Sequence, residues 1–151
     1  MKRKFALPTL GLLSCSAILA LAQPAQAKPQ CTTSNVAGDY GYTSIGSVVS
    51  PPVRPFAAVG RVTITSAGTF TGEQTTSVGG NVVDETINGT FAVDPDCTGT
   101  AIAYIYRGGS LVRTTSFDIV WDSNRKEFRA IFRSPGTGIT ITGQRMFEDD
   151  E

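Results

Sequence analysis

Hydrophobic and polar residues alternate along most of the chain, in short runs that turn residues separate. In the run at 56–65, for example, Ala58, Val62 and Ile64 share one side, and polar residues occupy much of the other. A period of two is the pattern of a half-buried strand, and no window shows a convincing helical period. The alternation predicts eight strands, at residues 38–49, 56–65, 69–78, 82–93, 100–107, 111–121, 126–133 and 138–147.

The connections between these strands are short, so each strand is expected to pair with its sequence neighbours. Gly79-Gly80-Asn81 is typical of a hairpin turn, because these residues tolerate positive φ. Residues 50–55 contain three prolines and are expected to lie outside the central ladder. The pattern predicts an all-β fold, an eight-stranded antiparallel up-and-down barrel, with a flattened β-sandwich as the alternative.

Residues 1–27 have the composition of a secretory signal peptide. Basic residues precede an apolar run, and small residues around Ala27 provide a cleavage site. A lipoprotein signal cut at Cys15 and a transmembrane anchor are the alternatives, although Pro8 and later polar residues shorten the apolar run. We therefore expect an exported protein, secreted or periplasmic, with one β-barrel domain at 28–151.

Charge excludes some partners. Removing the three basic residues of the signal from 13 leaves 10 against 13 acidic residues, a net charge of −3. A mildly negative chain lacks the excess of positive charge with which proteins bind nucleic acids or anionic membranes. Arg61, Arg129 and Arg133 fall on the second faces of their strands, where they would be costly against lipid, so the mature chain is not expected to insert into a membrane.

Cleavage of the signal also removes one of three cysteines and leaves Cys31 and Cys97. Two cysteines in an exported chain most often form a disulfide, which here would tie the N-terminal segment to the turn after the strand at 82–93. Two free thiols are the alternative. The chain contains no histidine that could activate a thiol.

The same lack of histidine leaves only carboxylates for a transition metal, so neither a metal nor another cofactor is expected. Asp94 and Asp96 flank a proline and could recruit calcium, but two carboxylates in a turn are also ordinary turn chemistry.

Two charged residues fall on apolar faces. Glu85 is in phase with Ile87 and Phe91, and Arg113 is in phase with Phe117 and Ile119. One interpretation is that the two charges pair or lie near a rim, because an unpaired buried charge is prohibitive. The other is that they form the polar floor of a ligand cavity, where a raised pKa would suit Glu85 to acid–base chemistry. The candidate ligand-binding residues are Glu85, Arg113, Gln74, Tyr104, Phe117 and Trp121.

Three stretches carry a resemblance to a known family: AAVGRVTITSAGTFTGEQT, INGTFAVDPDCTGT and SPGTGITITGQR. They resemble a family of small exported bacterial proteins without an established activity, whose predicted fold is similar to the calycin barrel of lipocalins and allene oxide cyclase. The resemblance covers nearly all of the mature chain and implies this barrel. The lipocalin glycine–x–tryptophan motif is absent, since the only tryptophan is Trp121, and no cyclase residue maps onto this chain.

Three functions are therefore considered. The first is a non-catalytic binding module for a small, mostly apolar molecule. The second is a structural or interaction protein with a filled barrel, and the third is an isomerase of the allene oxide cyclase type. A binding module is expected to leave a cavity of roughly 300 Å³ or more, whereas a filled barrel is not.

Overall fold

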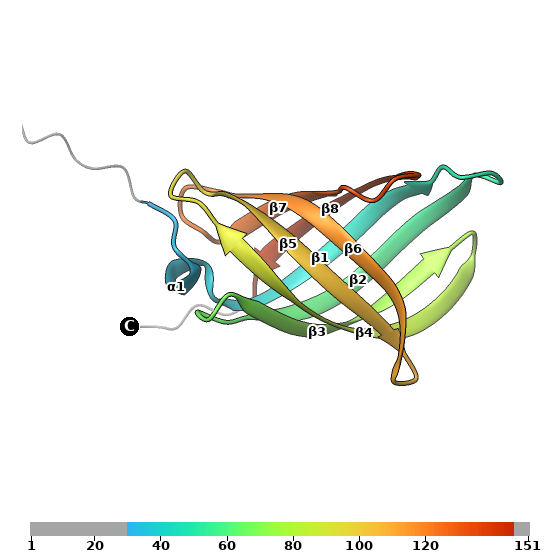
Figure 1. Cartoon of the computed structure of the whole chain (residues 1–151), viewed down its shortest axis with the longest axis horizontal. Coiled ribbons are helices and arrows are strands. Elements are labelled where there is room, and N and C mark those ends of the chain that lie inside the picture. The colour runs from blue at the N-terminus through green and yellow to red at the C-terminus, as the bar shows by residue number, and fades with distance from the viewer. Residues whose placement is uncertain (1–29, 147–151) are drawn as a thin grey trace, which may run out of the picture.

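In the computed structural model, which describes residues 30–146, eight antiparallel strands close into a barrel (Figure 1). Each strand pairs with its neighbours in sequence, and the last pairs with the first, with Tyr40 opposite Arg145 and Val48 opposite Thr137. The predicted up-and-down barrel is therefore confirmed. The elements are α1 (Thr33–Val36), β1 (Gly38–Val48), β2 (Arg54–Ile64), β3 (Thr69–Val78), β4 (Asn81–Val93), β5 (Thr98–Arg107), β6 (Ser110–Trp121), β7 (Glu127–Phe132) and β8 (Thr137–Arg145).

All eight predicted strands are present, with ends that shift by one or two residues. The largest correction is at Pro55, which was expected to lie outside the ladder but pairs with Ser47 inside β2. The Pro55 nitrogen has no proton to donate, but its carbonyl accepts a hydrogen bond from the Gly79 amide at 2.9 Å. The expected signal peptide at 1–27, the end of the last predicted strand at 147 and the acidic tail lie outside the described residues.

The short helix α1 was not predicted. It is one turn long, so no hydrophobic period could reveal it. A capping box forms it locally: the Thr32 hydroxyl accepts a hydrogen bond from the Asn35 amide, and the Asn35 side chain accepts one from the Thr32 amide.

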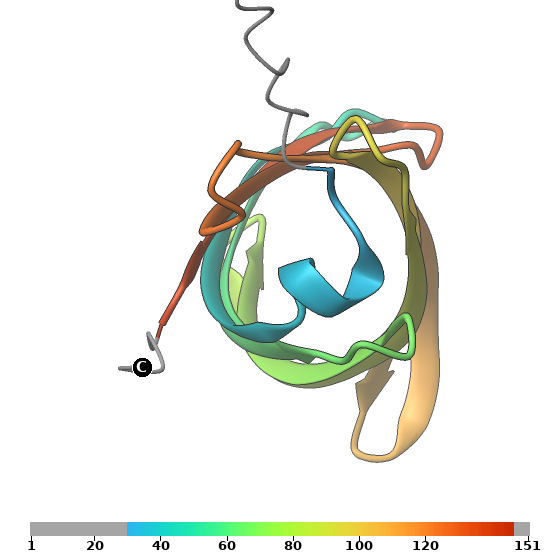
Figure 2. The same cartoon turned by 90° about the vertical axis from the view of Figure 1, so that its left-hand side faces the viewer.

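The helix α1 closes one mouth of the barrel, as the end-on view in Figure 2 shows. Val36, the last residue of α1, is fully buried, and the predicted Cys31–Cys97 disulfide joins the segment before α1 to the β4–β5 turn. This mouth is called the α1 end. The opposite mouth, which carries the β3–β4 and β5–β6 turns, is called the hairpin end.

Hydrogen bonds from the barrel wall also hold α1. The Arg145 guanidinium donates to the carbonyls of Asn35 and Ala37, at 3.3 and 2.8 Å. The buried Tyr40 hydroxyl lies 3.0 Å from the Val36 carbonyl oxygen. The carbonyls that the last turn of a helix leaves free are thus satisfied from β1 and β8, and the α1 end is sealed.

Inside the barrel, the side chains that alternation assigned to the apolar faces form the core. Aromatic rings fill much of it: Phe117 and Phe132 meet edge to face with centroids 4.8 Å apart, and Tyr40 and Phe128 do so at 5.5 Å. Trp121 packs between Phe91 and Phe128 near the α1 end. Phe132 also contacts Phe56, so aromatic pairs lie toward both ends of the barrel.

Candidate ligand-binding site

An apolar cavity of about 80 Å³ remains inside the barrel, and all eight strands contribute to its wall. Small side chains leave this space, notably Ala101 and Ala103 on β5 and Ala130 on β7. Aromatic rings, including Phe117 and Trp121, line much of the rest. The polar groups of the wall include Gln74 and Arg113, so the cavity borders both an aromatic region and a charged one.

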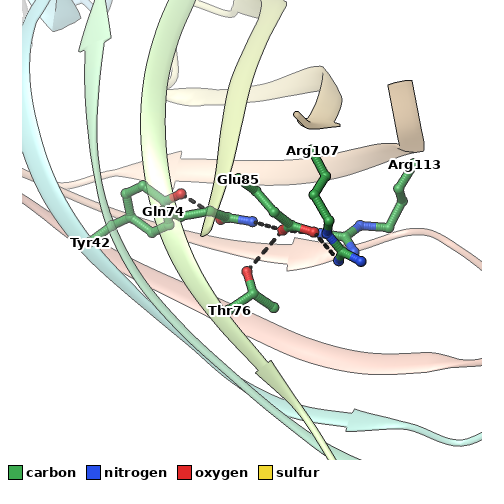
Figure 3. Close-up of polar contacts among 6 residues, drawn as sticks. All are labelled: Tyr42, Gln74, Thr76, Glu85, Arg107 and Arg113. Atoms are coloured by element: carbon green, nitrogen blue, oxygen red, sulfur yellow. Dashed lines mark hydrogen bonds and ion pairs between the residues drawn. The ribbon is translucent and has the colours of Figure 1, made fainter. Parts of the chain in front are cut away.

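The charged region is a hydrogen-bonded group of six side chains, here called the Glu85 cluster, which Figure 3 shows in close-up. Glu85 is its centre: the side chain is fully buried, and its two carboxylate oxygens accept from four residues. The members are Tyr42 on β1, Gln74 and Thr76 on β3, Glu85 on β4, Arg107 on β5 and Arg113 on β6.

The donors approach Glu85 from two sides (Figure 3). From β3, Gln74 Nε2 and Thr76 Oγ1 donate to Oε2 at 2.8 and 3.0 Å. From the other side, Arg107 Nη2 donates to Oε1 at 2.9 Å and Arg113 Nη2 donates to Oε2 at 3.2 Å. Both ion pairs are charge-assisted hydrogen bonds, which are among the stronger ones in proteins.

Strand register explains why these side chains meet. Gln74 and Glu85 are direct partners across the β3–β4 pair. The β4–β5 pairing ends at Thr86 opposite Tyr106, so the next residue of each strand, Glu85 and Arg107, lie beside each other at the end of the ladder. The cluster therefore lies toward the hairpin end of the barrel.

Gly60 allows Tyr42 to join the cluster across an intervening strand. A Cβ atom at Gly60 would lie 2.8 Å from the Cζ and hydroxyl oxygen of Tyr42, so the ring passes directly over this glycine. The Tyr42 hydroxyl then donates to Gln74 Oε1 at 2.7 Å, while Gln74 Nε2 donates onward to Glu85. Hydrogen bonding thus runs continuously from β1 to β6.

Electrostatics keep Glu85 ionised. Burial alone raises the pKa of the Glu85 carboxyl, but hydrogen bonds from Gln74 and Arg107, the charge of Arg113 and a hydrogen bond from Thr76 outweigh it. The pKa of Glu85 therefore lies below its ordinary value. One of the two sequence-based interpretations assigned Glu85 a raised pKa suited to acid–base chemistry, and that interpretation is wrong because four donors surround the carboxylate.

Tyr42 shows the opposite behaviour. Burial and the nearby Glu85 charge raise the pKa of its hydroxyl, and the Arg113 charge only partly opposes them. Near neutral pH, Tyr42 is therefore a neutral hydrogen-bond donor. Together with an ionised Glu85, it makes the cluster suited to holding and orienting polar groups.

The structure brings together most of the predicted site residues. Glu85, Arg113 and Gln74 meet in the cluster, and Phe117 and Trp121 line the cavity. Tyr104 does not join them. It lies on the outer face of β5 with 36% of its surface exposed, because the alternation places Ala103 and Ile105 inside instead.

The prediction missed Arg107 and Thr76, although the sequence carries a signal for each. Arg107 has the phase of Ala103 and Ile105, and Thr76 has the phase of Gln74. Leu111, by contrast, has the inner phase of Arg113 and Phe117 in the alternating sequence, but it is 54% exposed. A shift of register between Ile105 and Tyr106 moves the start of β6, and alternation alone cannot locate such a bulge.

Acidic residues elsewhere form no metal site. In residues 30–146 there is no group of three or more histidine, cysteine, aspartate or glutamate side chains that could hold a metal ion. Asp96 accepts hydrogen bonds from the Thr98 amide and hydroxyl at 3.0 and 2.6 Å, and these bonds lower the pKa of its carboxyl. Its contacts are those of a turn.

The fold and the site define the class of the protein: a closed, eight-stranded antiparallel barrel with a small internal apolar cavity, consistent with a calycin-like barrel. Comparison of the chain with models of protein families, with curated proteins and with solved structures finds no match in any of the three.

No helix within residues 30–146 is long and apolar enough to cross a membrane.

Proposed function

We propose that this protein is a non-catalytic binding module that takes a small, mostly apolar ligand into its barrel. The observation that carries the proposal is the asymmetry of the interior. Helix α1 and the Cys31–Cys97 disulfide close one end, the Glu85 cluster lies toward the other, and the apolar cavity lies between them. A pocket with apolar walls and a few convergent polar groups is the usual form of a small-molecule site.

The cavity volume restricts the ligand. At about 80 Å³ it is well below the roughly 300 Å³ expected of a pocket for a drug-sized molecule. It is also smaller than the apolar cavity of about 150 Å³ that accommodates benzene in another protein. The ligand is therefore proposed to be a slender alkyl chain that lies only partly in the cavity, with its polar end beside the partly exposed arginines of the Glu85 cluster. The enclosed part of the chain gains about 25 cal/mol per Å² of apolar surface buried.

The proposal places the protein outside the cytoplasm, in the periplasm or the medium of a bacterium. The signal-like residues 1–27 motivate this location, and the disulfide is compatible with it because disulfides persist in oxidising compartments. Membership of the exported calycin-like family belongs to the same proposal, supported by the closed barrel and by the three stretches that resemble the family.

The small cavity also favours a second candidate, a structural or interaction protein whose barrel is filled. In this case the aromatic contacts of Phe117, Phe132 and Trp121 serve stability alone, and the remaining space is a packing defect. The two candidate functions differ in whether small molecules from solution enter the barrel and bind there.

Tryptophan fluorescence distinguishes them. Trp121 is the only tryptophan of the chain and lines the cavity, so its emission reports on the interior. Titration with 1-hexanol is expected to give a saturable change in emission, and native mass spectrometry of the protein from its secretion medium is expected to show a bound small molecule. A flat titration together with ligand-free protein would support the filled barrel instead.

A further inference from the structure

The Glu85 cluster contains more positive than negative charge. Arg107 and Arg113 face a single carboxylate, so the cluster carries a net charge of +1 when all three groups are ionised. Each arginine uses one nitrogen, Nη2, for its bond to Glu85. A guanidinium has five N–H donors, so Glu85 does not saturate either residue.

The two arginines have different positions. Arg107 makes the shorter contact with Glu85, at 2.9 Å, and its side chain is 48% exposed to solvent. Arg113 makes the longer contact, at 3.2 Å, is 32% exposed and lines the apolar cavity. Arg107 is thus placed to neutralise Glu85, which leaves the charge of Arg113 available beside the cavity.

Arg113 also carries a buried donor without a partner. Its Nε atom is inaccessible to solvent and forms no hydrogen bond with residues 30–146. Buried donors are nearly always satisfied in proteins, so the Arg113 guanidinium retains hydrogen-bonding capacity that its contact with Glu85 does not use. Tyr42 and Gln74, which hydrogen-bond to each other, line the same cavity as Arg113.

We propose that Arg113 binds the anionic headgroup, a carboxylate, of a ligand whose apolar chain occupies the barrel cavity. This inference rests on the proposed binding function and narrows it to short-chain carboxylates. Planar guanidinium and carboxylate groups match in geometry and form paired, charge-assisted hydrogen bonds. Because Arg107 continues to pair with Glu85, a second carboxylate at Arg113 balances the remaining positive charge of the cluster.

The test compares hexanoate with 1-hexanol, which have the same chain length and differ in the headgroup. With Trp121 emission as the readout, hexanoate is expected to bind at least about tenfold more tightly, as hydrogen bonds to a charged group allow. Arg113→Gln is expected to remove most of this preference. Arg61→Gln is the control, because Arg61 pairs with Glu73 on the outer surface and should leave both affinities unchanged.

Glu85→Gln is expected to change the affinity for hexanoate in the opposite direction from Arg113→Gln. Removing the competing carboxylate frees both guanidiniums, so hexanoate is expected to bind several-fold more tightly than to the unmodified protein. General damage to the barrel would weaken hexanoate in this variant, as it would in Arg113→Gln. Opposite effects of the two substitutions therefore separate a binding role from a structural one.

The outcomes also distinguish this inference from the proposed function. If neither compound binds, the binding function itself is wrong, and the carboxylate site is wrong with it. If both bind with equal affinity, or if Arg113→Gln leaves the preference for hexanoate intact, the cavity binds apolar molecules but the carboxylate site at Arg113 is wrong.

Discussion

Glu85 accepts hydrogen bonds from four side chains inside the barrel, and its environment is built for a charge. Four donors, two of them guanidiniums, surround a fully buried side chain. Removing the charge while keeping the shape leaves these donors with a weaker acceptor, which costs about 1–3 kcal/mol of unfolding free energy. The half-exposed positions of Arg107 and Arg113 limit the loss, because both can turn toward water.

Because the pKa of Glu85 is lowered, its contribution to the free energy of unfolding depends on pH. A carboxyl whose pKa is lower in the folded state stabilises the fold above its unfolded pKa, about 4.3, and this stabilisation is lost as the pH falls through the folded value. The difference in melting temperature between the unmodified protein and Glu85→Gln is therefore expected to be largest between pH 6 and 8 and to shrink below about pH 4.

Glu73→Gln is the matched control for this measurement. Glu73 pairs with Arg61 on the surface at 3.8 Å, and both side chains are mostly exposed, so its effect should stay within about 0.5 kcal/mol at every pH. Equal melting temperatures for Glu85→Gln and the unmodified protein at pH 7 would contradict the stabilising role of the cluster.

At the scale of elements, α1 depends on the barrel rather than on its own helical stability. Four residues are too few to form a stable helix in isolation, and the Cys31–Cys97 disulfide and Arg145 hold it at the mouth. The disulfide joins residues 66 positions apart, so on the chain-entropy model it stabilises the fold by about 4 kcal/mol.

Replacing both Cys31 and Cys97 by serine is expected to lower the melting temperature and to speed hydrogen exchange at the α1 amides more than in the strands. The physical reason is that the cross-link restricts the unfolded chain and fixes the segment that precedes α1. Two alkylatable thiols in the native exported protein, with no change of melting temperature on reduction, would contradict this prediction.

Most of the strands and turns could be predicted from the sequence, because strand alternation, turn residues and loop length act locally. The eight strands and the side of the wall that most apolar residues face follow from a period of two. The bulge near Ile105 could not be predicted, because register depends on how two strands pair rather than on either strand alone. This shift accounts for the exposure of Leu111.

At the scale of the whole molecule, the question is whether the barrel interior is a ligand-binding site or only a hydrophobic core. The cavity is bounded in part by Ala103, and a leucine at this position would occupy much of its 80 Å³. Ala103→Leu is therefore expected to abolish the response of Trp121 emission to 1-hexanol while changing the unfolding free energy by less than about 1.5 kcal/mol.

The outward-facing Ala92 on the neighbouring strand β4 offers a control, since Ala92→Leu adds the same atoms in an exposed position. A loss of about 1–3 kcal/mol in Ala103→Leu, with no 1-hexanol response in the unmodified protein, would show that the barrel is already filled.

The sequence alone predicted the all-β class and the strand positions, because these rest on local alternation, and it favoured a closed barrel over a sandwich and a cysteine pair over two free thiols. It also placed Glu85 and Arg113 on inner faces. Only the tertiary structure decided that Arg107 shares the carboxylate, that Tyr104 faces outward and that the cavity is small. Those features depend on register and on how side chains from all eight strands fill a common volume, and no single stretch of sequence specifies either.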